Sequence, residues 1–516
     1  MRSPFVALFV ITILTALTGF VREAVMAASF GAGRETDAFF FAFGMVQTSH
    51  DLIFNGSLSA AVIPLLRPLA IAIGNDTLAA RARFGTTLTV IVVTSGFLLA
   101  GLLHFGAPII VHLLAPEMTA ATHTETVAFS RILVWLLPAN AMLTLFTLIL
   151  NAHDRFRAAA AIYLGSNIIF ILSILILAPL LGAQALPIAG VAGPLVFGPF
   201  LAYRLYRIGL LKWVKLDFSR RFFAAVMKLS GPPLLSLGIG SSFGLLMASH
   251  MILRGFAAAY GQGGISAAGY AFRLYEAPLS IIVNPVATLI FPAVAALAAT
   301  GRNKEFAALC RQVLTWGVII MFPAAVATFA GAEIIITLML KRGSFNAAAL
   351  TLTADALRGF APAVVFEGVF IVFFRIFYAL RRPGVPVAVA LVTLATLIVM
   401  LNVVSGGTLF GLAMALSASF ALAATILLMK LRQILGANVL PYWQEMARWA
   451  VASLAAGAPA MALDYLLGPG MAPRLLSLTV FFAGHTLCLA VLLPERRREA
   501  VTAVLIRMHG AGKEKH

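Results

Sequence analysis

The chain has 516 residues, of which 61% are hydrophobic by type and only 11% are charged, and its mean hydropathy is +0.99. Because soluble domains carry about 25% charged residues, this composition excludes a soluble enzyme, a disordered chain and a disulfide-stapled secreted module. The two cysteines, Cys310 and Cys488, predict neither a disulfide framework nor a metal cluster.

Long apolar runs predict helices that cross a membrane. Such a helix needs about 20 consecutive apolar residues, whereas the strands of a membrane barrel show about ten residues of alternating polarity. The runs therefore predict an all-α polytopic membrane protein with about 14 transmembrane helices. The predicted spans, numbered 1 to 14 in chain order, are 5–29, 38–66, 85–114, 127–150, 158–180, 184–203, 229–256, 265–298, 313–340, 356–379, 385–404, 407–429, 446–467 and 474–494.

The chain has a net charge of +18, and most of this excess positive charge lies in segments that the predicted topology places in the cytoplasm. The positive-inside rule places both termini in the cytoplasm, and no nucleic-acid partner is expected. We interpret the basic segments 208–228, a cytoplasmic linker, and 496–516, a cytoplasmic tail, as topology determinants. Contact of the linker with anionic headgroups of the phospholipid bilayer is the alternative. Arg254 and Arg358 are among the few cations that this topology places at outer loops or span edges.

A weak internal repeat links residues 30–33 (FGAG) to residues 260–263 (YGQG). Each motif follows one span and leads across the next one to a proline, and an even number of spans separates the two. This spacing predicts two six-helix lobes of parallel topology around a central cavity, an arrangement found in transporters. Chance similarity between Gly-, Ala- and Phe-rich helices is the alternative. The predicted lobes are 1–207 and 229–430, and spans 13 and 14 (431–495) fall outside the repeat.

Ionisable residues occur inside several spans, where each costs roughly 3 kcal/mol or more unless it faces a cavity or a partner. They are Arg22 and Glu23 in span 1, Arg273 and Glu276 in span 8, and Glu367 in span 10. Arg22 and Arg273 are candidates for a cationic clamp on a lipid-linked diphosphate, because a planar guanidinium binds two phosphate oxygens at once. Alternatively, Arg22 snorkels or pairs with Glu23. Arg273 and Glu276 share a helix face and are also placed to neutralise each other.

Span 2 is unusually polar and includes His50, Asp51 and Asn55. His50 and Asp51 are adjacent, so they are expected on different sides of a helix, which argues against a His–Asp proton relay. Asp37 follows Thr36 at the start of the span, where either residue suits an N-cap. The titratable residues available for coupling to an ion gradient are Glu23, Glu276, Glu367, His50 and Asp51.

Six short motifs occur in order along the chain. They are GFVRE (19–23), FGAG with TDAFF (30–40), LNA with a later RF (150–156), YAFRL (270–274), KRGSF (341–345) and FYA with a later PV (377–387). In these motifs the chain resembles the MurJ/MviN lipid II flippase family of the MOP exporter superfamily. The resemblance covers most of the sequence up to about residue 390, and the aspartate–aromatic stretch is among its most specific parts.

The resemblance implies fourteen helices in two lobes around a cationic cavity that alternates between inward- and outward-open states. It implies a non-enzymatic flippase of the bacterial cytoplasmic (inner) membrane. Its substrate would be undecaprenyl diphosphate carrying a cell-wall saccharide-peptide. The resemblance implies no cofactor. It implies coupling to the membrane potential or an ion gradient, and contact with the cell-wall synthesis machinery. Arg22, Asp37 and Arg273 match functional positions of the family, and with Asn55 they form the expected substrate-binding set.

Three departures from the family pattern make the expected clamp less cationic. The family usually has an arginine near position 16, where this chain has Ala16. It usually has an arginine pair where this chain has His50-Asp51, and Glu-Gly where this chain has Asn55-Gly56. Another polyprenyl-diphosphate glycan, such as an exopolysaccharide or O-antigen repeat unit, therefore stays open as the substrate.

Other functions also stay open. A cation-coupled drug antiporter of the same superfamily is the nearest alternative, because glutamates accompany the intramembrane arginines. A membrane glycosyltransferase or polymerase would need an acidic constellation that the short outer loops lack, and no Walker motif for ATP hydrolysis is present. A role confined to contacts within the cell-wall machinery is the remaining alternative.

Overall fold

The computed structural model describes residues 4–55, 75–152, 156–212, 216, 242–404, 407–436, 443–467, 476, 479–481, 483 and 484. These residues form helices and contain no β-strand. The first half of the chain contributes α1 (Pro4–Phe30), α2 (Arg34–His50), η1 (Asp51–Asn55), α4 (Asn75–Leu114), α5 (Ala120–Leu133), α6 (Leu136–Ala152), α7 (Phe156–Leu181), η2 (Gly182–Gln184) and α8 (Ala185–Arg207). The second half contributes α10 (Ser242–Ala257), η3 (Ala258–Tyr260), α11 (Gly264–Pro278), η4 (Leu279–Val283), α12 (Asn284–Ala299), α13 (Asn303–Ala330), α14 (Ala332–Met339), α15 (Ala347–Ala379), α16 (Gly384–Val404), α17 (Leu409–Leu435) and α18 (Trp443–Leu467).

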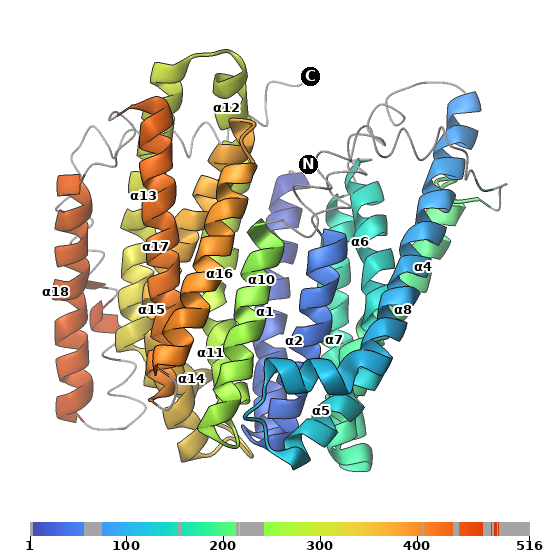
Figure 1. Cartoon of the computed structure of the whole chain (residues 1–516), viewed down its shortest axis with the longest axis horizontal. Helices are drawn as coiled ribbons and strands as arrows, with labels where there is room; N and C mark the ends of the chain where they lie inside the picture. The colour runs from blue at the N-terminus through green and yellow to red at the C-terminus, as the bar shows by residue number, and fades with distance from the viewer. Residues whose placement is uncertain are drawn as a thin grey trace.

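The helices form two bundles that stand side by side (Figure 1). In the first bundle α1 packs on α7, α7 on α8, α2 on α5 and α4 on α6. In the second bundle α15 packs against α11, α13 and α17, and α18 packs against α13. The bundles meet where α10 and α11 contact α2. The prediction of an all-α polytopic protein is confirmed, whereas the predicted linker 208–228 and tail 496–516 lie mostly or wholly outside the described residues.

Predicted spans 1 to 13 each overlap a described helix, whereas span 14 lies almost entirely outside the described residues. Seven helical segments of the described chain are long and apolar enough to cross a membrane, or eight if the pair α5 and α6, bent by 42°, is one span. One of the seven, Ala161–Arg207, contains both α7 and α8, which pack against each other. The total of fourteen spans stays a prediction.

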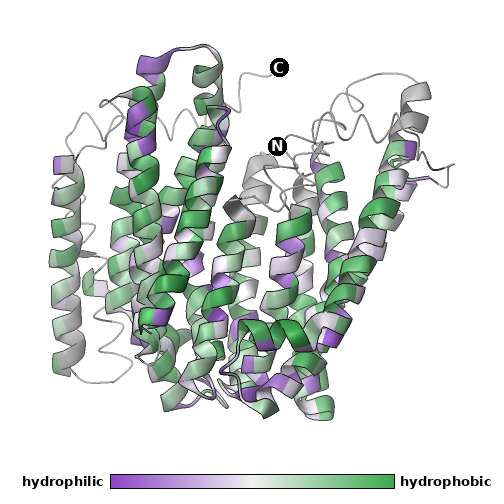
Figure 2. Ribbon diagram, viewed as in Figure 1, coloured by the Kyte–Doolittle hydropathy of each residue, from purple (hydrophilic) through white to green (hydrophobic). Residues whose placement is uncertain are grey.

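Hydrophobic residues follow most of the length of the outer helices (Figure 2), and many of their side chains are exposed. Leu102 and Phe105 on α4, Leu180 on α7 and Val403 on α16 are each at least 70% exposed. Exposing such side chains to water costs about 25 cal/mol for each Å² of apolar surface. Because no described segment covers them, this surface fits the hydrocarbon of a bilayer.

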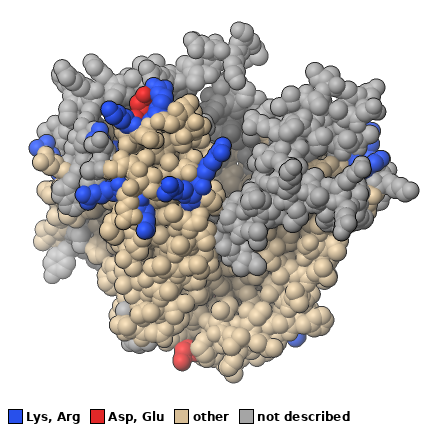
Figure 3. Space-filling view, turned by 45° about the horizontal axis from the view of Figure 1, so that its top comes forward, with Lys and Arg blue, Asp and Glu red and all other residues tan. Residues whose placement is uncertain are grey.

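Exposed cations gather at one end of the second bundle (Figure 3). They lie at the start of α13, in the turn between α15 and α16, and near the end of α17. They are Arg302, Lys304, Arg381, Arg382, Lys430 and Arg432. Helix α1 begins at this same end, the upper one in Figure 1.

Two helices between the bundles lose regular α geometry. Helix α2 continues as the π-helix η1, and α11 continues as the π-helix η4 before α12 begins. Pro278 and Pro285 flank η4, and proline cannot donate the backbone hydrogen bond that an α-helix requires. Single π-turns often accompany functional sites, and both of these lie in helices that meet the opposite bundle.

Candidate functional site

A cluster of arginines and glutamates lies between the bundles, where α1 approaches α11. Nη2 of Arg22 lies 2.6 Å from Oε1 of Glu23, and the same oxygen lies 3.7 Å from Nε of Arg273. Nη1 of Arg273 lies 3.6 Å from Oε2 of Glu276. Glu23 is therefore shared by one arginine from each bundle. We call Arg22, Glu23, Arg273 and Glu276 the arginine cluster.

Arg22 is held within its bundle by α7. Its Nη1 donates a hydrogen bond to Oδ1 of Asn167 at 3.4 Å, and its guanidinium lies 5.3 Å from the ring centre of Phe170. Nδ2 of Asn167 donates in turn to the Thr15 carbonyl and to Oγ1 of Thr18. These contacts hold Arg22 within its bundle, and its contact with Glu23 is the pairing that the sequence offers as an alternative to the clamp. Sequence reasoning missed Asn167, because one asparagine in an apolar span forms no pattern.

Two polar atoms of the arginine cluster form no hydrogen bond within the described residues. The side chain of Glu23 is 8% exposed, yet its Oε2 makes no hydrogen bond within the described chain, and neither does Nε of Arg273. The side chains of Arg273 and Glu276 are about a third exposed, at 33% and 30%. Because a buried polar atom without a partner costs roughly 1–3 kcal/mol, two such atoms in one cluster indicate a site that accepts a polar ligand.

Asp37 lies apart from this cluster, in the first turn of α2, where the two repeat motifs meet. Helix α2 begins at the lower end of Figure 1. Its Oδ2 accepts a hydrogen bond from the Gly263 N–H at 2.6 Å, and its Oδ1 accepts from the N–H and the hydroxyl of Ser266, both at 2.7 Å. These donors lie at the N-terminus of α11, which favours a carboxylate. Asp37 therefore joins the bundles, while Thr36 accepts the hydrogen bond from the Gly33 N–H.

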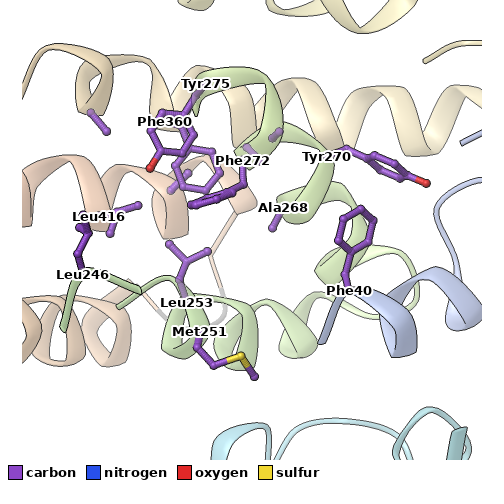
Figure 4. Packing of buried hydrophobic residues seen from close by; sticks show 14 of the residues in the cluster. Phe40, Leu246, Met251, Leu253, Ala268, Tyr270, Phe272, Tyr275, Phe360 and Leu416 are labelled. Atoms are coloured by element: carbon purple, nitrogen blue, oxygen red, sulfur yellow. The ribbon is translucent and has the colours of Figure 1, made fainter. Parts of the chain in front are cut away.

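Further contacts close the same end. The Tyr270 hydroxyl donates to the Gly31 carbonyl at 3.1 Å, and its ring packs edge-on against Phe40 with ring centres 4.9 Å apart (Figure 4). The Ser344 N–H donates to the Ala28 carbonyl at 2.9 Å. Gly31 has a φ of 68°, and a Cβ there would meet the Ser344 carbonyl, so this position requires glycine. We call the contacts of Asp37, Tyr270 and Ser344 the lower seam.

His50 and Asp51 contact each other at the junction of α2 and η1, although they are neighbours in the chain. Nδ1 of His50 lies 3.1 Å from Oδ1 of Asp51, and Nε2 of Gln47 donates to both Asp51 oxygens at 3.2 Å. The argument from helical spacing did not anticipate this contact. Nε2 of His50 lies 3.4 Å from Oγ1 of Thr144. Asn55 ends η1, and its side chain is not among those described.

Glu367 belongs to a separate buried network within the second bundle. The Tyr275 hydroxyl donates to Oε2 of Glu367 at 2.8 Å and lies 3.3 Å from Nε2 of His250. The Tyr275 ring also stacks on Phe360, with ring centres 5.0 Å apart (Figure 4). Tyr275 precedes Glu276 on α11, so this network adjoins the arginine cluster. Across the described ranges, no set of three or more His, Cys, Asp or Glu side chains is arranged to hold a metal ion.

Arg254 joins the polar residues between the bundles, although the topology prediction placed it at an outer span edge. Its side chain in α10 is only 9% exposed. It repels Arg273 and attracts Glu23 and Glu276 electrostatically. An arginine near the end of an apolar run gives no sign of burial, because its packing partner, Gly44 on α2, is far away in the sequence.

The fold and the site together define a two-lobed, multi-pass membrane transporter. A solved structure of the lipid II flippase MurJ in an inward closed conformation is similar with a TM-score of 0.76 at 18% identity, covering 94% of this chain and 98% of that chain. An inward-facing multidrug resistance MATE family transporter of the MOP superfamily is similar with a TM-score of 0.66 at 14% identity, covering 83% of this chain and 95% of that chain. At these identities the two structures establish the fold alone.

The sequence model of the family described as lipid II flippase MurJ matches residues 26–481. The chain therefore belongs to this family, as the motifs predicted. A probable lipid II flippase MurJ of Rhizobium meliloti (strain 1021) is 30% identical over 346 residues, which span 65% of this chain and 62% of that relative's length.

Proposed function

We propose that the protein is a non-enzymatic flippase that moves lipid II, the lipid-linked peptidoglycan precursor, from the inner to the outer leaflet of a bacterial cytoplasmic membrane. The observation that carries the proposal is the arginine cluster, in which Arg22 and Arg273 from opposite lobes share Glu23. Guanidinium groups bind phosphate and carboxylate oxygens with the same geometry. A diphosphate is therefore able to replace the shared carboxylate and bind both lobes.

The arginine cluster is suited to bind the diphosphate of the substrate rather than its glycan. A polyprenyl-diphosphate-linked exopolysaccharide unit would present the same group to Arg22 and Arg273. Membership of the lipid II flippase family favours the undecaprenyl-linked peptidoglycan precursor over that alternative. Mass spectrometry of the lipid that copurifies with the protein identifies the glycan.

The distribution of charge supports an orientation. We assign the end with the exposed cations (Figure 3) to the cytoplasm, because positive charge accumulates on that side of bacterial membrane proteins. Helix α1 then begins at the cytoplasmic side, in keeping with the cytoplasmic termini predicted from the sequence, and the lower seam lies at the outer face. In alternating access, the hydrogen bonds of Asp37 and Tyr270 break whenever the outer side opens.

We further propose that the membrane potential or an ion gradient drives transport without a bound cofactor. The titratable groups that lie between the lobes or buried within one of them are Glu23, Glu276, Glu367 and the His50–Asp51 pair. On the outer leaflet, the cell-wall synthesis machinery is the partner that would consume the translocated lipid.

A cation-coupled drug antiporter is the second candidate, because a MATE family transporter shares the fold. It ranks below the flippase, since Arg22, Arg254 and Arg273 would repel a cationic drug. Comparing the affinity for a lipid diphosphate with the affinity for a cationic dye separates the two functions.

The flippase proposal is tested by depletion and by reconstitution. Depletion in cells should cause the precursor to accumulate on the inner leaflet, and vesicles that contain the protein should translocate labelled lipid II. If precursor on the inner leaflet does not rise when the protein is lost, the proposal fails.

A further inference from the structure

We propose that Arg254 is a third arginine of the diphosphate-binding site, contributed by α10 and acting with Arg273 on the phosphate oxygens. The inference rests on the proposed function, because it requires a substrate that carries a diphosphate. It adds a binding residue from a helix in which no motif marked a site.

Arg254 is buried, and no carboxylate of the described residues lies within ion-pair distance of its guanidinium. It lies in the last turn of α10, a helix that packs on α2 and η1 of the first lobe and on α11, α16 and α17 of the second. None of the ion pairs in the described part of the chain includes Arg254. Because a buried charge without a counter-charge is unfavourable, this position calls for an anion.

A glycine on the opposite lobe creates the space for the guanidinium. A Cβ at position 44 of α2 would overlap Nη1 of Arg254 and would lie 3.1 Å from its Cζ. Cζ of Arg254 also lies 5.4 Å from the ring centre of Phe272, a distance at which a cation and an aromatic ring attract. Packing between Gly44 and Phe272 therefore fixes the guanidinium where no ion pair does.

The charges around Arg254 favour a polyvalent anion. Arg254 repels Arg273 and attracts Glu23 and Glu276, so with Arg22 three arginines face two glutamates. Like charges on neighbouring helices are unfavourable unless an anion lies between them. A diphosphate supplies both the negative charge and enough oxygens for several guanidinium forks.

The competing explanation is that Arg254 only fills the space between Gly44 and Phe272. Ligands that differ in their phosphates separate the two explanations. The full-length protein in detergent is titrated with undecaprenyl diphosphate, undecaprenyl monophosphate and undecaprenol, and its thermal unfolding is recorded. In Arg254→Gln we expect the Kd for the diphosphate to rise by about tenfold or more, as for lost hydrogen bonds to charged groups, with undecaprenol binding unchanged.

A conservative variant and a matched control complete the experiment. Arg254→Lys keeps the charge but not the fork, so its loss of diphosphate affinity should be smaller than that of Arg254→Gln. Arg358→Gln removes an arginine that pairs with Glu333 and Asp355 outside the cluster, and it should bind all three lipids as the unaltered protein does.

The outcomes distinguish this inference from the proposed function. Unchanged diphosphate affinity in Arg254→Gln, or an equal loss for the diphosphate and for undecaprenol, overturns the role of Arg254. If Arg254→Gln does not fold, Arg254→Lys decides by the same comparison. If the unaltered protein shows no preference for the diphosphate over undecaprenol, the proposed function fails as well.

Discussion

The arginine cluster and the lower seam both join the two lobes, but they satisfy their polar groups in opposite ways. In the seam, each oxygen of Asp37 accepts at least one hydrogen bond from the start of α11, and the residue is 2% exposed. In the cluster, Oε2 of Glu23 and Nε of Arg273 make no hydrogen bond within the described ranges. Completed hydrogen bonds stabilise one conformation, whereas incomplete ones leave room for a ligand. This difference supports the proposal that the arginine cluster binds the substrate and that the lower seam closes the outer side.

The largest effect is expected for Arg273. Arg273→Ala should abolish transport and leave expression and membrane insertion intact, because water fills the polar space that the side chain leaves. Arg273→Lys should restore transport only in part, since an ammonium supplies the charge without the two-pronged fork. Complementation of a flippase-deficient strain, together with the amount of protein in the membrane, measures both outcomes.

A double variant decides whether Arg273 binds a ligand or only balances Glu276, which lies 3.6 Å away. If it only balances the charge, Arg273→Ala loses stability, and the double variant Arg273→Ala, Glu276→Ala recovers expression and transport. We expect no complementation by the double variant, and complementation would contradict the clamp.

The second largest effect is expected in the lower seam. Asp37→Ala removes the acceptor from the Gly263 and Ser266 donors, and each buried donor left unpaired costs about 1–3 kcal/mol. Hydrogen exchange at these two amides should therefore accelerate by about tenfold or more.

Thr36→Val is the matched control for Asp37→Ala. The Thr36 side chain is buried beside Asp37, and it forms hydrogen bonds with the Gly33 backbone of its own lobe. Exchange at the amides of Gly263 and Ser266 should stay as in the unaltered protein. Equal exchange at these amides in Asp37→Ala and Thr36→Val would sink the assignment of closure to the seam.

A smaller effect is expected for Tyr275→Phe. The variant keeps the ring that stacks on Phe360 but removes the hydroxyl between Glu367 and His250. The free energy of unfolding should fall by about 1–3 kcal/mol, measured by thermal unfolding in detergent. Tyr206→Phe, at an exposed position of α8, is the control, and an equal melting temperature for both variants would show that the network adds no stability.

The smallest effect is expected for Arg302→Gln. Arg302 and Glu305 form a surface ion pair at 2.6 Å, with side chains 58% and 55% exposed. Exposed pairs contribute about 0–1 kcal/mol, so unfolding and transport should barely change. A loss of transport as large as that of Arg273→Ala would mean that net charge, rather than the arginine cluster, governs activity.

The sequence predicted the part of the site that depends on single residues. A charged residue in an apolar run is visible without a structure, so the sequence alone singles out Arg22 and Arg273, whereas their shared contact with Glu23 is visible only in the structure. The residues that contact one another across the site are harder to predict from the sequence. Asp37 suits an N-cap by local pattern but accepts hydrogen bonds from the opposite lobe, and the contact between His50 and Asp51 is not expected from their adjacent positions.

Composition and the lengths of the apolar runs determined by themselves that the chain is an all-α membrane protein. The free energy of placing a residue in a bilayer depends on that residue and its near neighbours, so the sequence contains this information. Only the tertiary structure decided that Arg254 lies against Gly44 and that Asp37 accepts hydrogen bonds from the start of α11. These contacts join residues far apart in the chain, and no local pattern specifies which faces of two distant helices meet.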